Sequence, residues 1–479
     1  MHFDTLNIAL GMLLLGGVIA LVTRPVNAVY AYLIVIFFFP NVSWGVAAGV
    51  ETMNLYWRGT GYFYFSFINL YLYATYVLGI YYWGRRNRGV DACNLHKFFI
   101  FFLVLFLVQC MLGTLDGVPP ERILMQRGTI NIVNMGLFTM LLIRAVNTPR
   151  EVERFCTVIL VCGTARGAYG MLRFLFWGGD IANVYDNVQK LGIKLTFFDI
   201  NDGALACLAG FIAAWRFFDK GSPARHKPVY AAIVVLEVLL VAFSYRRTGW
   251  AGLALASVLF CFMQPLRLRI PLLVGGVAAG GLGLTALIVR RFAKLSHGQA
   301  AADMLFYDVK ASVKEGRMAE LYHAFQTVAE HPLLGVGPWG GYGPNHIEFM
   351  HSGFLHLWLK SGLMGLLPFL MMLAAFASFC VRRHTAVPWS QRGLFGAGFA
   401  GLLFFMPNLV GGTPIIEYRT MQMTGLCLAL PYIAYGVFFS AAAKRQVDPA
   451  RAPSGFALAR QKLIDAERAG AARRERPTA

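Results

Sequence analysis

The chain has 479 residues, of which 57% are hydrophobic, 14% aromatic and only 14% charged. This composition excludes a set of soluble domains, because apolar runs of about 20 residues, the length a helix needs to cross a bilayer, recur along almost the whole chain. The formal net charge of +19 does not indicate a nucleic-acid partner, since most basic residues lie in short connections between apolar runs. We therefore expect an all-α polytopic membrane protein that binds membrane lipid and no nucleic acid.

The cysteines and the N-terminus do not indicate disulfide, metal or signal-peptide chemistry. Eight cysteines are present. Most lie inside apolar runs and none forms a CxxC pair, so we expect buried thiols that act as small hydrophobic side chains. The first residues, MHFDTLNIAL, have no basic region and no small-residue cleavage site, which favours a first membrane helix over a removable signal peptide.

Apolar segments that could each form a membrane helix follow one another along the chain. Pro40 interrupts the second segment, so the sequence predicts 12 or 13 helices. The candidate spans are 5–22, 28–50, 61–83, 98–115, 129–146, 155–177, 203–218, 229–245, 249–264, 270–289, 353–381, 393–411 and 420–441.

Basic residues mark every second connection between these spans. Because Lys and Arg concentrate in the cytoplasmic loops of membrane proteins, these connections predict the orientation of the bundle. The basic connections contain Arg85, Arg86, Arg88 and Lys97, then Arg144, Arg150 and Arg154, then Lys220, Arg225 and Lys227, then Arg267 and Arg269, then Arg382, Arg383 and Arg392.

This orientation divides the chain into two parts. We expect residues 1–443 to form the helical bundle, with one large structured loop at 290–352 on the opposite side, which faces the exterior or the periplasm. Residues 444–479 are basic and poor in large apolar side chains, so we expect a cytoplasmic tail that is disordered or partly helical.

The large loop contains two patterned segments. Apolar side chains recur at helical spacing within 317–329, which predicts an amphipathic helix that lies on the bundle or on the membrane surface; they are Met318, Leu321, Tyr322, Phe325 and Val328. Residues 331–343 contain seven Gly or Pro residues and cannot form a stable helix. The amphipathic helix is either a lid over the bundle or part of a catalytic site.

Arg246 and Arg247 lie side by side between two apolar runs on the predicted external side. A charged residue at the centre of a membrane helix costs about 2.5–3.5 kcal/mol, and such residues usually face a polar cavity that marks a functional site. The planar guanidinium can bind two phosphate oxygens at once. We therefore favour an anion site over two side chains that only reach lipid headgroups.

His351 lies just before the apolar run at 353–381. A histidine can accept or donate a proton near neutral pH, so this residue could act as a general base or could only hold the loop by hydrogen bonds. The alternatives for the same role are His323, His331, His346 and His356.

Other charged residues gather on the same side. Arg317 opens the amphipathic helix, where a cation opposes the helix dipole; this favours an anionic ligand, and a carboxylate such as Glu315, Asp308 or Glu320 is the alternative partner. Lys194, Asp199 and Asp202 belong to another external loop, and Arg166 and Arg173 lie in the apolar run before it. Arg166 lies deep enough in that run to need a partner or a polar pocket. The two aspartates could form an acid–base pair. No Walker loop, GxGxxG or HExxH motif occurs in the sequence, so nothing supports a nucleotide or zinc mechanism.

Three segments together resemble the O-antigen ligase and O-antigen polymerase superfamily of bacterial membrane glycosyltransferases. Residues 244–247 are similar to the family's Ser-x-Ser-Arg segment and put Arg247 at its arginine. Residues 317–337 resemble its arginine, amphipathic helix and Pro-Leu-Leu-Gly-Val-Gly. Residues 351–365 resemble its His-Asn…Gly-Leu-x-Gly segment, with His351 at the histidine and Ser352 in place of the usual asparagine.

The resemblance implies a GT-C-type bundle in the bacterial inner (cytoplasmic) membrane. The enzyme would move a glycan from a polyprenyl (undecaprenyl) diphosphate carrier to a glycan or lipid-linked acceptor on the periplasmic face, without a cofactor or metal. It would act as a polymerase or ligase in lipopolysaccharide or exopolysaccharide biosynthesis. A flippase or other transporter of lipid-linked saccharides is the alternative, but the unusual arginines and histidines gather on one side, which favours the enzyme.

The resemblance also implies roles for individual residues. His351 would accept the proton of the attacking hydroxyl, and Arg247 would stabilise the charge of the departing diphosphate. The basic residues that would bind the diphosphate are Arg247, Arg246, Arg317, Lys194 and Arg173.

Overall fold

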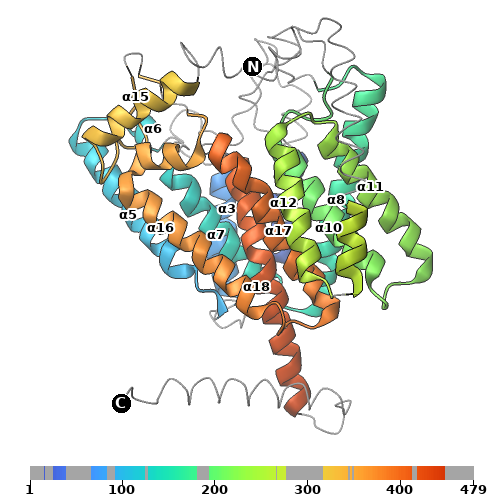
Figure 1. Ribbon diagram of the computed structural model, residues 1–479. Helices are drawn as coiled ribbons and strands as arrows, with labels where there is room; N and C mark the ends of the chain where they lie inside the picture. The colour runs from blue at the N-terminus through green and yellow to red at the C-terminus, as the bar shows by residue number, and fades with distance from the viewer. Residues whose placement is uncertain are drawn as a thin grey trace, which may run out of the picture.

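A computed structural model of the chain (Figure 1) describes residues 16, 25–38, 66–83, 92–124, 128–180, 194–265, 267–276, 317–343, 346–347, 350–412 and 418–447. Helices provide the regular structure of these residues, which contain no strand beyond an isolated β-bridge between Tyr342 and Ile347. The chain is an all-α polytopic membrane protein, which confirms the fold class predicted from its composition.

Four of the described helices are long and apolar enough to cross a membrane. They are α5 (His96–Leu115), α8 (Pro149–Phe176), α16 (Gly353–Arg383) and the greater part of α17 (Trp389–Gly411). Shorter apolar helices are α2 (Pro25–Phe38), α7 (Thr129–Ala145) and α12 (Arg247–Met263). The other helices are α3 (Phe67–Trp83), α6 (Pro120–Ile123), α10 (Ile200–Phe218), the 3-10 helix η1 (Ala224–His226), α11 (Lys227–Ala242), α15 (Arg317–Glu330) and α18 (Tyr418–Val447).

Most of the predicted spans coincide with a helix. The spans at 98–115, 129–146 and 203–218 match α5, α7 and α10 to within a few residues. The span at 5–22 lies outside the described residues apart from residue 16, and so do residues 39–50 of the second span. The choice between 12 and 13 helices, which depends on that second span, stays a prediction. Most of the span at 270–289, of which 270–276 are helical, also lies outside the described residues, as do 290–316 and the tail beyond residue 447.

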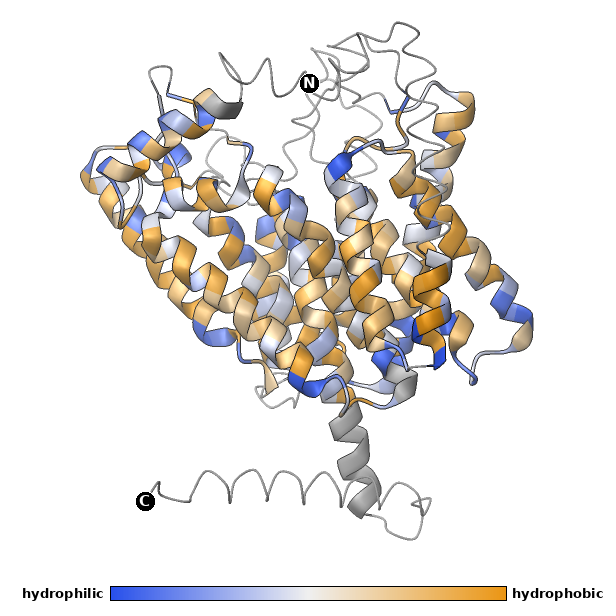
Figure 2. Ribbon diagram, viewed as in Figure 1, coloured by the Kyte–Doolittle hydropathy of each residue, from blue (hydrophilic) through white to orange (hydrophobic). Residues whose placement is uncertain are grey.

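The centre of the bundle is formed by α7 and α18, whose side chains are buried over most of their described length. Hydrophobic residues predominate along the helices of the bundle (Figure 2), and some of them, such as Ile100, Leu107 and Met371, are exposed on its outer wall. A bundle that is apolar both inside and on its outer wall is suited to the hydrocarbon of a membrane. Its helices also satisfy their own backbone hydrogen bonds, which a hydrocarbon environment requires.

Contacts between helix ends establish which termini lie together. The start of α10 meets the end of α11, since the Thr196 N–H donates to the Phe243 carbonyl at 3.2 Å, and α12 begins four residues later. Helices α12 and α17 pack in opposite directions, with Gly252 against the Phe404 backbone. Helix α17 follows α16 through a short turn, so it begins at the end of the bundle where α16 finishes. Helix α12, which runs opposite to α17, therefore begins at the same end as α16, and α10 begins beside it. We call this end of the bundle the site end.

The opposite end collects the basic connections. Arg216, near the end of α10, donates to Glu153, near the start of α8, at 2.6 Å, and Arg382 and Arg383 end α16. The alternation of basic and non-basic connections predicted from the sequence therefore corresponds to two different ends of the bundle.

Helix α16 is broken at Gly362, where φ is +63° and ψ is −167°. The glycine-rich loop packs into this break. The amides of Leu363 and Met364 donate to the carbonyls of Pro332 and Leu333 at 2.9 and 3.1 Å. A Cβ atom at Gly362 would lie 2.0 Å from the Leu333 oxygen, so both the backbone conformation and the close approach require glycine.

The carbonyls on the other side of the break are satisfied as well. The Val336 amide donates to Leu359 O at 2.8 Å, and the Gln109 side chain of α5 donates to Lys360 O at 3.0 Å. The fully buried Lys360 ammonium donates to Pro338 O at 3.2 Å and also to Gly340 O. The predicted non-helical loop is thus bonded to the first third of α16.

Candidate active site

His351 is held by a carboxylate at the start of α16. Its Nδ1 atom lies 2.9 Å from Oε2 of Glu320, and its backbone N–H donates to Oε1 of the same carboxylate. The Ser352 hydroxyl accepts from the Leu355 amide and caps the helix directly after it. A carboxylate on Nδ1 fixes the ring and favours a proton on Nδ1, which makes Nε2 the basic nitrogen.

Glu320 is positioned by the packing of α15. Its helix rests on α16 through a small apolar cluster of Ala324, Val328, Tyr342, Met350, Leu355 and Leu359. Burial, and then the nearby Glu320 carboxylate, raise the pKa of the Tyr342 phenol above its ordinary value, so this side chain stays neutral. The Glu320 side chain is 14% exposed and that of His351 is 45% exposed, so the carboxylate lies beneath an accessible imidazole.

The amphipathic helix predicted over 317–329 is confirmed as α15. On its apolar face Val328 is buried and Leu321 packs against the cluster, while Tyr322 and Phe325 are 62% and 52% exposed. Ala324, whose small side chain is fully buried, lets the helix pack closely on α16. The Phe325 ring instead meets Trp358 edge-on, with ring centroids 6.2 Å apart.

The alternative histidines have different surroundings. His346 is exposed in a turn, with a positive φ of 46°, and His331 is exposed after the end of α15. His356 is fully buried in α16, and His323 lies against Gly343. Of the described histidines considered for this role, His351 is the one whose exposed ring is shown bonded to a carboxylate.

The two adjacent arginines at the start of α12 have different environments. Arg246 donates from Nη1 to Phe198 O at 2.6 Å, and its guanidinium lies 4.7 Å from the centre of the Phe198 ring. Arg247 is the first helical residue of α12 and its side chain is exposed. Tyr245, with φ of +51°, reverses the chain just before them. The turn therefore directs Arg246 to a neighbouring segment and Arg247 outward.

That neighbouring segment, residues 194–202, is also bound by Arg173. The buried Arg173 guanidinium donates to Thr196 O at 2.6 Å and lies 3.0 Å from Asp180. Asp180 in turn accepts from the Phe198 amide at 2.7 Å. Lys194 lies at the beginning of the segment and is exposed. Of the predicted diphosphate ligands in this region, Arg173 and Arg246 bind protein carbonyls, whereas Lys194 and Arg247 face outward.

A buried ion-pair network anchors the other end of the same segment. Arg419, which is fully buried, donates to Asp199 at 2.6 Å and to Asp202 at 2.8 Å. Arg166 forms two bonds with Asp202, at 3.0 and 3.1 Å. The two aspartates considered as an acid–base pair are therefore bound to arginines. Arg419 was not predicted as part of a site, because it belongs to none of the motifs found in the sequence.

The predicted residues fall into two groups at the site end. One contains His351 with Glu320 and α15, which begins at Arg317, three positions before Glu320. The other contains Arg173, Arg246, Arg247 and Lys194 around the 194–202 segment. No group of His, Cys, Asp and Glu suited to a metal ion occurs within the described ranges.

These features define a polytopic helical membrane protein with a basic, histidine-containing site at one end of its bundle. Residues 232–370 match the family model described as O-Antigen ligase. This match confirms, over that segment, the resemblance to the O-antigen ligase and O-antigen polymerase superfamily seen in the sequence. A search of curated proteins finds no match. The matched segment contains Arg246, Arg247 and Arg317, and also Glu320 and His351.

Proposed function

We propose that the protein transfers a glycan from a polyprenyl diphosphate carrier to a sugar hydroxyl on the periplasmic face of a bacterial inner membrane. The observation that carries this proposal is the His351–Glu320 pair. It supplies an accessible imidazole, oriented by a carboxylate, within the segment that matches the ligase family. Such a pair suits an enzyme that must remove a proton from a hydroxyl group.

In the proposed reaction, Nε2 of His351 accepts the proton of the acceptor hydroxyl as its oxygen attacks the anomeric carbon of the donor. A new glycosidic bond forms while the bond between that carbon and the diphosphate oxygen breaks. Both electrons of the broken bond leave with the polyprenyl diphosphate. The imidazolium that results is stabilised by the carboxylate of Glu320, which lies 2.9 Å from Nδ1.

The leaving diphosphate gains charge as the bond breaks, and cations placed there lower the barrier. Arg247 is the arginine best placed for this role, since its side chain is exposed at the start of α12. We assign Lys194 and Arg317 as further cations for the diphosphate. Arg173 and Arg246 act one step away, because they bind Thr196 and Phe198 and thereby hold the loop that carries Lys194.

The test is transfer by purified protein with a synthetic polyprenyl-diphosphate saccharide and a glycan acceptor. The proposal expects a lengthened or ligated glycan and an equal amount of released polyprenyl diphosphate. Movement of the labelled donor across vesicles, with its diphosphate bond intact and no product, would instead identify a transporter. In a deletion strain, shortened glycans would indicate a polymerase, and full-length glycan left on the carrier would indicate a ligase.

A further inference from the structure

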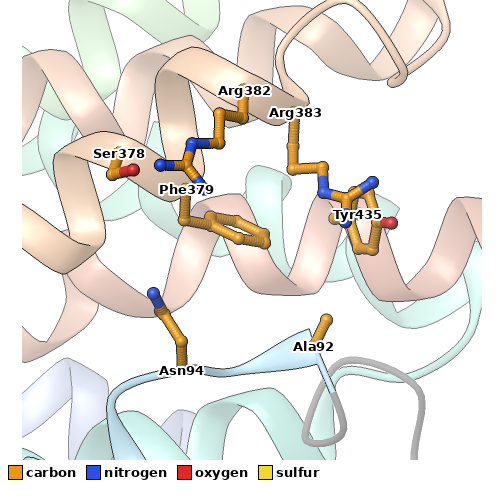
Figure 3. A pocket seen from close by; sticks show the side chains of 7 residues that line it. All are labelled: Ala92, Asn94, Ser378, Phe379, Arg382, Arg383 and Tyr435. Carbon is orange, nitrogen blue, oxygen red and sulfur yellow. The ribbon is translucent and has the colours of Figure 1, made fainter. Parts of the chain in front are cut away.

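The opposite end of the bundle contains a cavity that the proposed transfer reaction does not use. Its volume is about 290 Å³, and it lies between the last turns of α16, the middle of α18 and the chain that leads into α5 (Figure 3). It is lined by Ala92, Asn94, Ser378, Phe379, Arg382, Arg383 and Tyr435.

The cavity lies at the membrane surface remote from His351. Beyond its break at Gly362, helix α16 runs on to Arg383, a length of about 30 Å, which matches the roughly 30 Å of bilayer hydrocarbon. His351 precedes its first residue, while Arg382 and Arg383 are its last two. The two arginines therefore reach the lipid headgroup region on the opposite side.

The chemistry of the cavity suits an anion. Arg382 and Arg383 both line it, the Ser378 hydroxyl adds a hydrogen-bond donor, and none of its seven lining residues is acidic. The Arg383 guanidinium lies 5.6 Å from the centre of the Tyr435 ring. Figure 3 shows Arg382 on the side of Ser378 and Arg383 on the side of Tyr435, with Phe379 between them. Two guanidinium groups thus flank one opening.

The wall of the cavity is built from fixed contacts. The Asn94 amide donates to Ala375 O at 3.1 Å, and its oxygen accepts from the Tyr432 hydroxyl. The Phe379 ring stacks on Tyr432, with ring centroids 4.2 Å apart. These bonds join the entry to α5, the end of α16 and α18, so the arginines project from a rigid frame.

An apolar stripe on the surface of α16 leads to this cavity. Met364, Leu367 and Met371 are all exposed. At 100° per residue, these three side chains share one face of the helix with Ser378 and Arg382. A molecule that lay along this face would place an apolar body against the methionines and leucine, and a polar end against the arginines.

We propose that this cavity binds the phosphate headgroup of an anionic phospholipid, whose acyl chains lie along the Met364–Leu367–Met371 stripe. Basic pockets between membrane helices are suited to such headgroups, because arginine binds phosphate oxygens and the acyl chains remain in the bilayer. The apolar stripe favours a lipid over a free phosphate ion, which needs no such surface. The proposal is independent of the transfer reaction at the other end.

The test measures lipid binding to the full-length protein in detergent by native mass spectrometry, with added phosphatidylglycerol or phosphatidylcholine. The double variant Arg382→Gln/Arg383→Gln should bind phosphatidylglycerol about 30-fold more weakly, since each basic residue near an anionic lipid surface contributes about fivefold. The matched control is Lys220→Gln/Arg225→Gln, which removes the same charge from exposed positions outside the cavity. It should retain binding to within about threefold.

A second cavity variant tests the proposal independently, in case the double variant does not fold. Ser378→Phe fills the cavity without changing charge and should also weaken binding of phosphatidylglycerol. Equal binding of the two lipids by the wild type, or unchanged binding in both cavity variants, would overturn the proposal. Displacement of the lipid by inorganic phosphate at constant ionic strength would also overturn it, because the site would then be one for free phosphate.

Discussion

Glu320 and His351 are 31 residues apart in the sequence, yet Oε2 of the first lies 2.9 Å from Nδ1 of the second. The pair joins α15 to the residue just before the N-cap of α16, and both helices begin in the segment that matches the ligase family. It gives α15 a part in positioning the histidine, beyond covering the bundle as a lid would.

The first prediction concerns this carboxylate. Glu320→Gln keeps the size of the side chain but removes the charge that stabilises the imidazolium, so we expect turnover to fall about 10²–10⁴-fold, the range of a general-base contribution. Donor affinity should be unchanged. Glu330→Gln, at the exposed end of the same helix, is the control and should transfer normally. Wild-type turnover in the Glu320→Gln protein would remove the positioning role.

The second prediction concerns the base itself. His351→Ala should fold and bind the lipid-linked donor but transfer about 10²–10⁴-fold more slowly. A base must be neutral to accept a proton, so the wild-type rate should fall when the pH is lowered far enough to protonate the base, and the residual rate of the variant should lack this fall. Donor affinity and turnover are measured on the same purified samples. If His346→Ala is inactive while His351→Ala is not, the base is His346.

The third prediction separates the adjacent arginines. Arg247→Lys keeps the charge but loses the two-pronged geometry, so transfer should drop sharply while expression stays normal. Arg246→Ala removes the bond to Phe198 O, so it should lower the free energy of unfolding by about 1.5–3 kcal/mol. Transfer assays and thermal unfolding in detergent distinguish the two effects. Full activity of Arg247→Ala would contradict its assignment to the diphosphate.

The fourth prediction concerns the buried network. Arg419→Met leaves Asp199 without its arginine and removes one of the two arginines of Asp202, and breaking a buried pair costs about 3–5 kcal/mol. Little folded protein should be recovered. The control is Arg216→Met, whose partner Glu153 has a side chain that is 61% exposed, where the loss should be about 0–1 kcal/mol. Equal melting temperatures for the two variants would show that the network is not needed for stability.

The fifth prediction concerns the break in α16. Gly362→Ala places a Cβ atom 2.0 Å from Leu333 O at a φ of +63°, so the loop must move away and transfer should be lost. Gly210→Ala is the control, because the nearest atom to its new Cβ, in Glu237, is 3.5 Å away. Cysteine accessibility at Leu334 reports the position of the loop. A Gly362→Ala protein with normal transfer would show that the break is not needed at the site.

Local patterns in the sequence predicted most of the fold, because membrane helices are defined by runs of apolar residues. The span at 129–146 became α7 almost residue for residue. Arg166, expected to need a partner or a polar pocket at its depth, is paired with Asp202. Both inferences depend only on the cost of placing a group in hydrocarbon, which a single sequence can supply.

Pairings between distant residues could not be predicted. Glu320 was considered as a neighbour of Arg317, but the structure places it on His351. Arg419 meets aspartates that lie 217 and 220 residues earlier, and no periodicity encodes that distance. The burial of Ala324 on α15 was not predicted either, because the pattern of large apolar residues does not mark a small side chain, whereas close helix packing favours one.

The break in α16 has a consequence for the order in which the protein is assembled. Two amides and two carbonyls freed at the break are satisfied by residues 332–336 and by Gln109. In hydrocarbon each such group left alone would cost several kcal/mol. The first third of α16 therefore cannot reach its final conformation during synthesis until the preceding loop has arrived on its own side of the bilayer and α5 is already in place. Completion of this part of the helix and maturation of the site are then a single event.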